Sequence, residues 1–175
     1  MPGTRWPLVL SGALMVCMDW EQLRATVHVL AACSALAAGA VVLALPKGEG
    51  AHRLMGTVYV LALVVANVAA LSLRRENAFG VFHALAIVSL VTLAVGLTPM
   101  LLGKRSPVVI ATHAYCMTWS YAGLVAAGCG QLAAVVGEEA GAWIVPLVIA
   151  TALSTSAAGI FMRVPPILHR MLGEP

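Results

Sequence analysis

The sequence predicts an all-α integral membrane protein, a bundle of five transmembrane helices with a core of four and a short N-terminal interfacial helix. Of its 175 residues, 61% are hydrophobic and 10% are charged, whereas soluble chains have about 45–50% apolar and roughly 25% charged residues. The mean hydropathy is +0.96, and the apolar residues form runs of about 20, the length that crosses a bilayer. This composition excludes a water-soluble enzyme, a nucleic-acid-binding protein and a disordered tail.

Five apolar runs are long enough to cross the membrane, at residues 25–45, 54–73, 78–102, 108–136 and 142–162. The breaks between them contain Gly, Pro and charged residues, which interrupt helices. Because every connection is short, consecutive helices are expected to pack as antiparallel neighbours. We therefore predict one membrane domain, with an N-terminal segment at 1–23, a four-helix core at 25–136 and a fifth helix at 142–162.

Residues 6–18 are apolar but too few to span a bilayer. A secretory signal peptide is the alternative, yet only Arg5 precedes this run, and the Asp19-Trp20-Glu21 sequence after it contains no small-residue cleavage site. An interfacial or half-inserted helix is the expectation.

The distribution of Lys and Arg predicts the orientation. With five spans, six Lys and Arg residues lie on one side of the membrane and four on the other. Five of the seven acidic residues lie on the side that has four cations. The N-terminus is therefore expected outside the inner (plasma) membrane and the C-terminus in the cytoplasm, with the inverted topology as the alternative. The six cations are Lys47, Arg53, Lys104, Arg105, Arg163 and Arg170.

The spans contain no Asp or Glu, and Asn67 and Gln131 are their only amides. Pumps and ion-coupled transporters usually keep a buried ionisable relay, so these functions are disfavoured. Phosphate-binding loops, nucleophile elbows and zinc-binding helix motifs are also absent. The four cysteines show no CxxC spacing and are interpreted as apolar core residues.

Histidine is the conspicuous residue that remains, with one in each of the first four helices near its amino-terminal end. Because the helices alternate in direction, His28 and His83 are expected near the outer face, and His52 and His113 near the inner face. His169, beyond the fifth predicted span, is interpreted as a surface residue.

A weak internal repeat supports this pairing. The chain reads His-Val-Leu-Ala-Ala-Cys-Ser from His28 and His-Ala-Leu-Ala-Ile-Val-Ser from His83. Two duplicated hairpins would place equivalent side chains face to face across a pseudo-two-fold axis. Facing imidazoles are what axial ligation of a haem iron requires. We therefore predict that haem b is bound, with His28 and His83 as outer ligands and His52 and His113 as inner ligands.

Each of these residues also has a structural interpretation. A histidine at a membrane interface is usually an amphipathic helix-end residue. Arg53 and Arg24, beside His52 and His28, could reach haem propionates or could be anchors that extend to the interface. Small residues on the His28 face could accommodate a macrocycle or a packed helix.

The sequence favours the outer pair over the inner pair. His52 adjoins Arg53 at the membrane edge, whereas His113 lies eight residues beyond Arg105, which is roughly 12 Å along a helix.

The run His52-Arg53-Leu54-Met55-Gly56-Thr57-Val58-Tyr59 resembles a motif, His-Arg-x-x-Gly-x-x-Tyr, of a family of small bacterial multi-pass membrane proteins. The resemblance covers residues 26–127. Where family members often have a Trp-Met pair after the fourth histidine, this chain has Met117-Thr-Trp119. One histidine per helix is also similar to the di-haem transmembrane cytochromes b, which hold two haems between helix pairs, although this likeness is one of architecture alone.

These observations lead to two hypotheses from different classes. The first is a b-type haem-binding electron-transfer subunit of a membrane oxidoreductase, which exchanges electrons with quinol or a partner protein and has no soluble substrate domain. The second is a non-catalytic accessory subunit of a larger membrane complex, docked through the fifth helix. A transporter is a weaker third alternative. The lipid bilayer is a partner in each case, and nucleic acid in none.

Overall fold

The computed structural model describes residues 19–73, 80–136 and 144–172, which are helical apart from short turns. The helices are α1 (Trp20–Ala44), α2 (Gly50–Ser72), α3 (Val81–Leu101), α4 (Pro107–Val136) and α5 (Ile144–Leu172). These ranges contain no strand, and the predicted all-α class and five helices are confirmed. The interfacial helix predicted over residues 6–18 lies outside the described residues.

Helices α1 and α5 exceed the predicted apolar runs by the most. Helix α1 begins at Trp20 instead of residue 25, because polar contacts support its first turns. The Arg24 guanidinium bonds Glu21 at 3.2 Å and the Ser72 carbonyl of α2 at 2.9 Å, and it lies over the Trp20 ring. His28, expected near the amino-terminal end of its helix, is therefore the ninth residue of α1.

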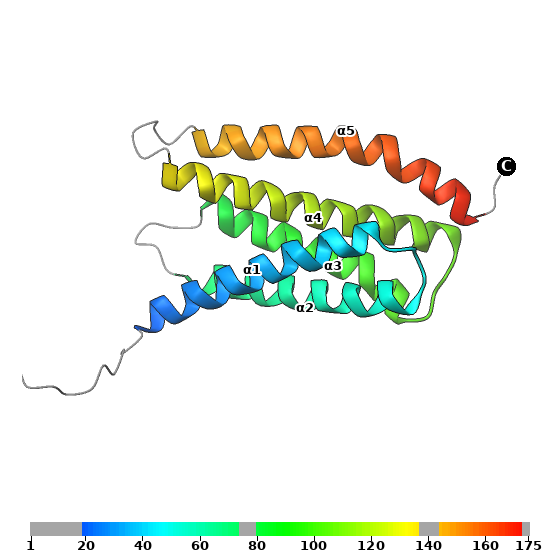
Figure 1. The fold of residues 1–175 in the computed structure, drawn as a ribbon, viewed down its shortest axis with the longest axis horizontal. Helices are drawn as coiled ribbons and strands as arrows, with labels where there is room; N and C mark the ends of the chain where they lie inside the picture. The colour runs from blue at the N-terminus through cyan, green and yellow to red at the C-terminus, as the bar shows by residue number, and fades with distance from the viewer. Residues whose placement is uncertain (1–18, 74–79, 137–143, 173–175) are drawn as a thin grey trace, which may run out of the picture.

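Helix α5 continues ten residues beyond its predicted end at residue 162, through Pro165 and Pro166. Buried Val164 and Leu168 attach this extension to α4. A proline inside a helix removes a backbone hydrogen bond and bends the helix, and Figure 1 shows α5 bending toward its C-terminus.

The helices form two hairpins, α1 with α2 and α3 with α4, and α5 packs against α4. In Figure 1, α4 and α5 lie above α1 and α2. Helix α3 contacts α2 and α4, and α1 touches α4 along a short stretch. Because the chain alternates in direction, α2 runs parallel to α4 and α1 runs parallel to α3. We call the end that carries turns 45–49 and 102–106 the inner end, and the opposite end the outer end.

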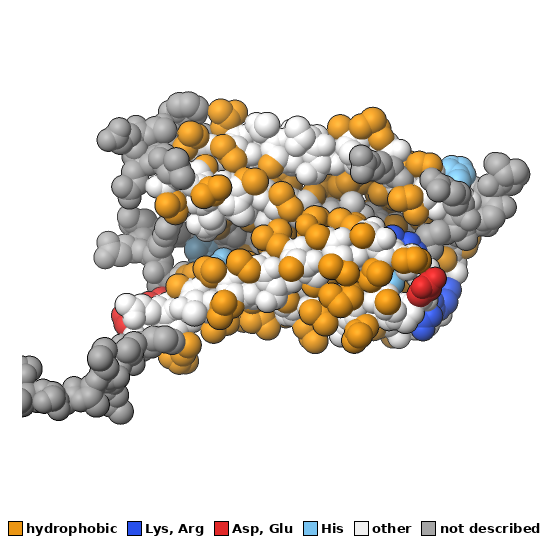
Figure 2. Space-filling view, viewed as in Figure 1, with side chains coloured by type: hydrophobic (Ala, Val, Ile, Leu, Met, Phe, Trp, Pro, Cys, Tyr) orange, Lys and Arg blue, Asp and Glu red, His pale blue; other side chains and the backbone are white. Residues whose placement is uncertain are grey.

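The helix lengths and compositions match a membrane bundle. Helices α1, α2 and α3, and residues Ile144–His169 of α5, are long and apolar enough to cross a bilayer. Helix α4 is not among these four candidate spans, yet it has 30 residues and runs along the bundle between α3 and α5. Its polar side chains are mostly covered by neighbouring helices. Apolar side chains cover the flanks of the bundle in Figure 2 and would contact lipid.

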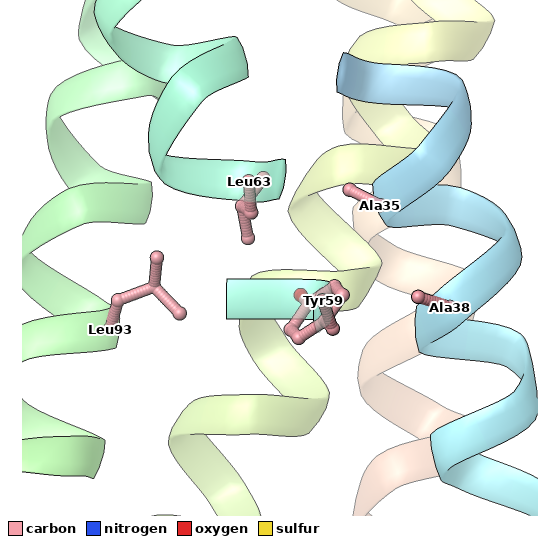
Figure 3. Packing of buried hydrophobic residues seen from close by; sticks show 5 residues of the cluster. All are labelled: Ala35, Ala38, Tyr59, Leu63 and Leu93. Carbon is pink, nitrogen blue, oxygen red and sulfur yellow. The ribbon is translucent and has the colours of Figure 1, made fainter. Parts of the chain in front are cut away.

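The core lies where α1, α2, α3 and α4 converge. Its buried members are Ala35, Ala38, Tyr59, Leu63 and Leu93 (Figure 3). Small residues on α1 let the helices approach closely, as is usual in membrane bundles. Gly39 is the extreme case, because a Cβ there would overlap the ring of Tyr121 from α4.

Candidate functional site

The polar groups with the most specific placement are the helix-end histidines. Figure 2 shows histidine side chains toward both ends of the bundle and none midway along the visible face. The structure describes the surroundings of all four histidines of the first four helices, and these surroundings differ.

His113 is fixed against α3. Its Nδ1 lies 3.0 Å from the Gly96 carbonyl oxygen. A carbonyl oxygen only accepts, so Nδ1 carries a hydrogen, and in the neutral imidazole Nε2 keeps its lone pair. Gly96 permits this contact because α4 is very close to it, and a Cβ at this position would lie 2.6 Å from that of Cys116. Histidine ligands typically donate their second ring nitrogen to such a carbonyl.

His52, the third residue of α2, lies at the same end. Its Nδ1 is buried and has no hydrogen-bond partner among the described residues. The ring lies near the Val42 backbone and within electrostatic range of Lys47 and His113. A buried polar atom without a partner is costly, which makes this nitrogen notable.

One hydrogen bond places His52 and His113 at the same level. Tyr59 of α2 and Ser120 of α4 are joined at 2.7 Å, and Figure 3 shows Tyr59 projecting from α2 toward α1 and α4. Each histidine precedes its bonded residue by seven positions, nearly two turns, so it lies on the same face about 10 Å toward the inner end. Since α2 and α4 are parallel, the two imidazoles lie at matched depth.

The outer histidines lie at different depths. The Nδ1 of His28 is 2.9 Å from the carbonyl of Ala66. The next residue, Asn67, donates to Ser89 Oγ at 3.0 Å, which places His28 near the level of Ser89. His83 precedes Ser89 by six residues, or about 9 Å of helix. The packing of the helices thus places the inner histidines at the same depth and the outer histidines at different depths, whereas the sequence favoured the outer pair.

The tautomers of the outer histidines differ as well. His28 donates from Nδ1 and keeps the Nε2 lone pair. The Nδ1 of His83 accepts the Gly80 backbone N–H at 3.4 Å, at the start of α3, so its hydrogen is on Nε2. His169 is exposed on α5, as the sequence predicted for a surface residue.

Several cations lie at the same end of the bundle as the inner pair. Arg53, Lys104 and Arg105 are exposed at this end, and Glu49 is the one acidic residue of its described turns. Lys47 is half-buried and donates from Nζ to the carbonyls of Val42 and Leu43 at 2.8 and 2.9 Å. These cations could neutralise an anionic group bound beside the histidines.

Within the described ranges, no three His, Cys, Asp or Glu side chains are placed to share a metal ion. One or two imidazoles could serve as ligands only for a group that supplies its remaining ligands itself. An iron porphyrin has this chemistry.

Comparison with known proteins gives the family. A model described as "Predicted membrane protein (DUF2306)" matches residues 25–158, which is most of the chain. The chain belongs to the DUF2306 family. The match covers nearly all of α1 to α4 and extends into α5, beyond the resemblance noted in the sequence. No curated protein and no solved structure matched this chain.

Two important residues of this DUF2306 protein were missed by sequence reasoning, namely Gly96 and Ser120. Neither has a local signal of its own, because small residues are frequent in every span. Their signal is a spacing, since both Tyr59 and Ser120 follow a histidine by seven positions. Tyr59 itself was noted in the sequence, as the last residue of the His-Arg-x-x-Gly-x-x-Tyr run.

Proposed function

We propose that this DUF2306 protein is an electron-transfer subunit of the membrane that binds haem b through its helix-end histidines. His52 and His113 would hold the inner iron, and His28 and His83 an outer one. The observation that carries the proposal is the matched depth of His52 and His113 on parallel helices, set by the Tyr59–Ser120 bond. Bound haem would supply a one-electron carrier within the bilayer.

The residues around the inner pair fit such a group. His113 keeps a lone pair on Nε2 because Nδ1 is bonded to Gly96. Gly56, one turn after His52, has no heavy atom within 4 Å of where a Cβ would stand, which leaves room for a flat ring. Arg53 and Lys47 lie at the same end and would pair with propionates. In the outer pair, His28 carries its ring hydrogen on Nδ1 and His83 carries it on Nε2. To bind iron through Nε2, His83 would have to move that hydrogen to Nδ1.

The experiment is a reduced-minus-oxidised spectrum of the purified protein, with haem quantified per chain. Sharp b-type bands are expected. His52→Ala and His113→Ala should each remove the inner haem, and His28→Ala or His83→Ala should remove the outer haem alone. His169→Ala, on exposed α5, is the matched control. A well-folded protein without b-type bands would refute the proposal.

A second candidate function is that of an accessory subunit in a larger membrane complex. Helix α5 packs mainly on α4. Leu147, Thr151 and Thr155, spaced by four residues along α5, are exposed. Small and hydroxyl side chains are suited to helix contacts in lipid. A colourless protein that copurifies stoichiometrically with a larger assembly would favour this function. In the first proposal, quinol or a redox partner protein would exchange electrons with the haem.

We also propose an orientation, with the inner end in the cytoplasm. In Figure 2, Lys and Arg side chains gather at the inner end. The described cations there are Lys47, Arg53, Lys104 and Arg105, and cytoplasmic loops favour such residues. In a cysteine-free background, a cysteine replacing Lys104 should resist a membrane-impermeant thiol reagent in intact spheroplasts, and one replacing Gln22 should react. The reverse pattern would establish the inverted topology.

A further inference from the structure

We propose that Tyr59 and Ser120 are positioning residues for the His52–His113 site. Their hydrogen bond would fix the register and separation of α2 and α4, and thereby the geometry at which the two imidazoles meet a shared ligand. This inference rests on the proposed function and adds a role for two residues that touch neither haem nor substrate.

We call the Tyr59–Ser120 hydrogen bond the tie between α2 and α4. Its surroundings allow it to hold the two helices in a fixed position. Tyr59 and Ser120 are 3% and 2% exposed, so water does not compete for the 2.7 Å contact. Ser120 Oγ donates its hydrogen to the Met117 carbonyl at 2.8 Å. A serine hydroxyl has one hydrogen to give, so Tyr59 donates to Ser120. The chain of bonds thus runs from a side chain of α2 to the backbone of α4.

This tie matters because α2 and α4 lie diagonally across the bundle. They are not among the helix pairs that pack closely, whereas α1–α2, α3–α4 and α2–α3 are. The contact between the two helices that carry His52 and His113 depends on a long side chain reaching across. Tyr59 provides that reach, and Gly39 of α1 leaves space beside its ring.

The position of Tyr59 relates the His, Gly and Tyr of the His-Arg-x-x-Gly-x-x-Tyr run to one proposed site. His52, Gly56 and Tyr59 are spaced by four and three residues, so they lie on one face of α2. Along this face, the proposed ligand His52 is followed by the open space beside Gly56 and then by Tyr59, which bonds to α4. A one-residue shift of either helix would break the Tyr59–Ser120 bond and move His52 out of level with His113.

Tyr121 offers a matched control. It is the next residue after Ser120, its ring centroid is 6.3 Å from that of Tyr59, and its hydroxyl donates to the Leu36 carbonyl at 3.4 Å. This bond joins α4 to α1 and does not involve α2. Tyr121→Phe therefore removes a phenolic hydroxyl from the same core without cutting the proposed tie.

The test measures the midpoint potential and the low-spin EPR signal of the inner haem in Tyr59→Phe, Ser120→Ala and the double variant. Each single variant should shift the potential and broaden the signal. The double variant should resemble the singles, because all three lack the same bond. Tyr121→Phe should match the wild type, and Ser120→Thr, which keeps the hydroxyl, should restore its signal.

A second readout needs no haem. Spin labels on cysteines replacing exposed Leu54 of α2 and Val108 of α4, with native cysteines removed, report the distance between these helices. Tyr59→Phe should broaden or shift that distance distribution, and Tyr121→Phe should not. Unchanged haem signals and distances in Tyr59→Phe and Ser120→Ala would overturn the positioning role. A wild type without haem, but with the expected distance change, would refute the proposed function alone.

Discussion

His113 donates its Nδ1 hydrogen to the carbonyl of Gly96 across the α3–α4 interface, at 3.0 Å. Gly96 also packs closely against Cys116 and Met117 of α4. One glycine therefore serves both as a packing contact and as the hydrogen-bond acceptor that orients an imidazole. Packing and site geometry are coupled at this point.

Replacing Gly96 with Ala should destabilise the protein and displace His113. The new methyl would lie 2.6 Å from Cys116 Cβ, and both atoms are bonded directly to the backbone of their helices, so the helices themselves would have to shift. Overpacking of this kind costs typically about 1–3 kcal/mol. Thermal unfolding in detergent should show a lower midpoint for Gly96→Ala. Gly128→Ala on α4, where a Cβ meets open space, is the control. Equal midpoints for the two variants would contradict the close approach.

Gly56→Leu should keep the fold and lose haem. The site of its Cβ is open, and removing a helix glycine relieves about 0.5–1 kcal/mol of backbone entropy cost, so the unfolding midpoint should not fall. The added side chain would occupy the space proposed for the porphyrin. Haem content per chain is the measurement. Gly159→Leu on α5, also open, should leave that content unchanged. Retention of haem by Gly56→Leu would show that the macrocycle does not use this face.

The Asn67–Ser89 hydrogen bond should stabilise the α2–α3 contact by a small amount. Asn67 is 9% exposed and donates to Ser89 at 3.0 Å. Side-chain hydrogen bonds between membrane helices contribute about 0.6 kcal/mol on average and up to about 1.7 kcal/mol. A double-mutant cycle of Asn67→Ala and Ser89→Ala should give a coupling in that range. Zero coupling would mean that the bond contributes nothing in the bilayer. Ser34→Ala, whose hydroxyl bonds within α1, is the control.

The sequence predicted the helices and the ends at which the histidines lie, because both follow from the lengths of apolar runs and the alternation of direction. It could not predict the depth of His28, because the early start of α1 depends on Arg24 reaching the Ser72 carbonyl of another helix. The continuation of α5 past Pro165 likewise depends on Val164 and Leu168 being buried against α4.

The candidate site was predictable in its residue types and less so in its geometry. Interfacial arginines were used to judge the depth of His52 and His113, but depth is set by how neighbouring helices pack. The Tyr59–Ser120 bond joins residues 61 positions apart, and no local pattern identifies such a partner. Gly96 matters through the Cys116 side chain of the next helix, which a single sequence does not pair with it.

Lys47 provides a pH-dependent prediction outside the spans. Burial lowers its pKa from the ordinary value of 10.5, because a half-buried ammonium loses hydration. The unfolded chain then binds more protons than the folded one as pH approaches 10.5 from below, so stability should rise with pH in that window. An amine-reactive reagent, with mass spectrometry of the Lys47 peptide, should give a half-labelling pH below 10.5 in folded protein and a higher one in denaturant. If folding left that value unchanged, the Nζ contacts with Val42 and Leu43 would not bury the amine in solution.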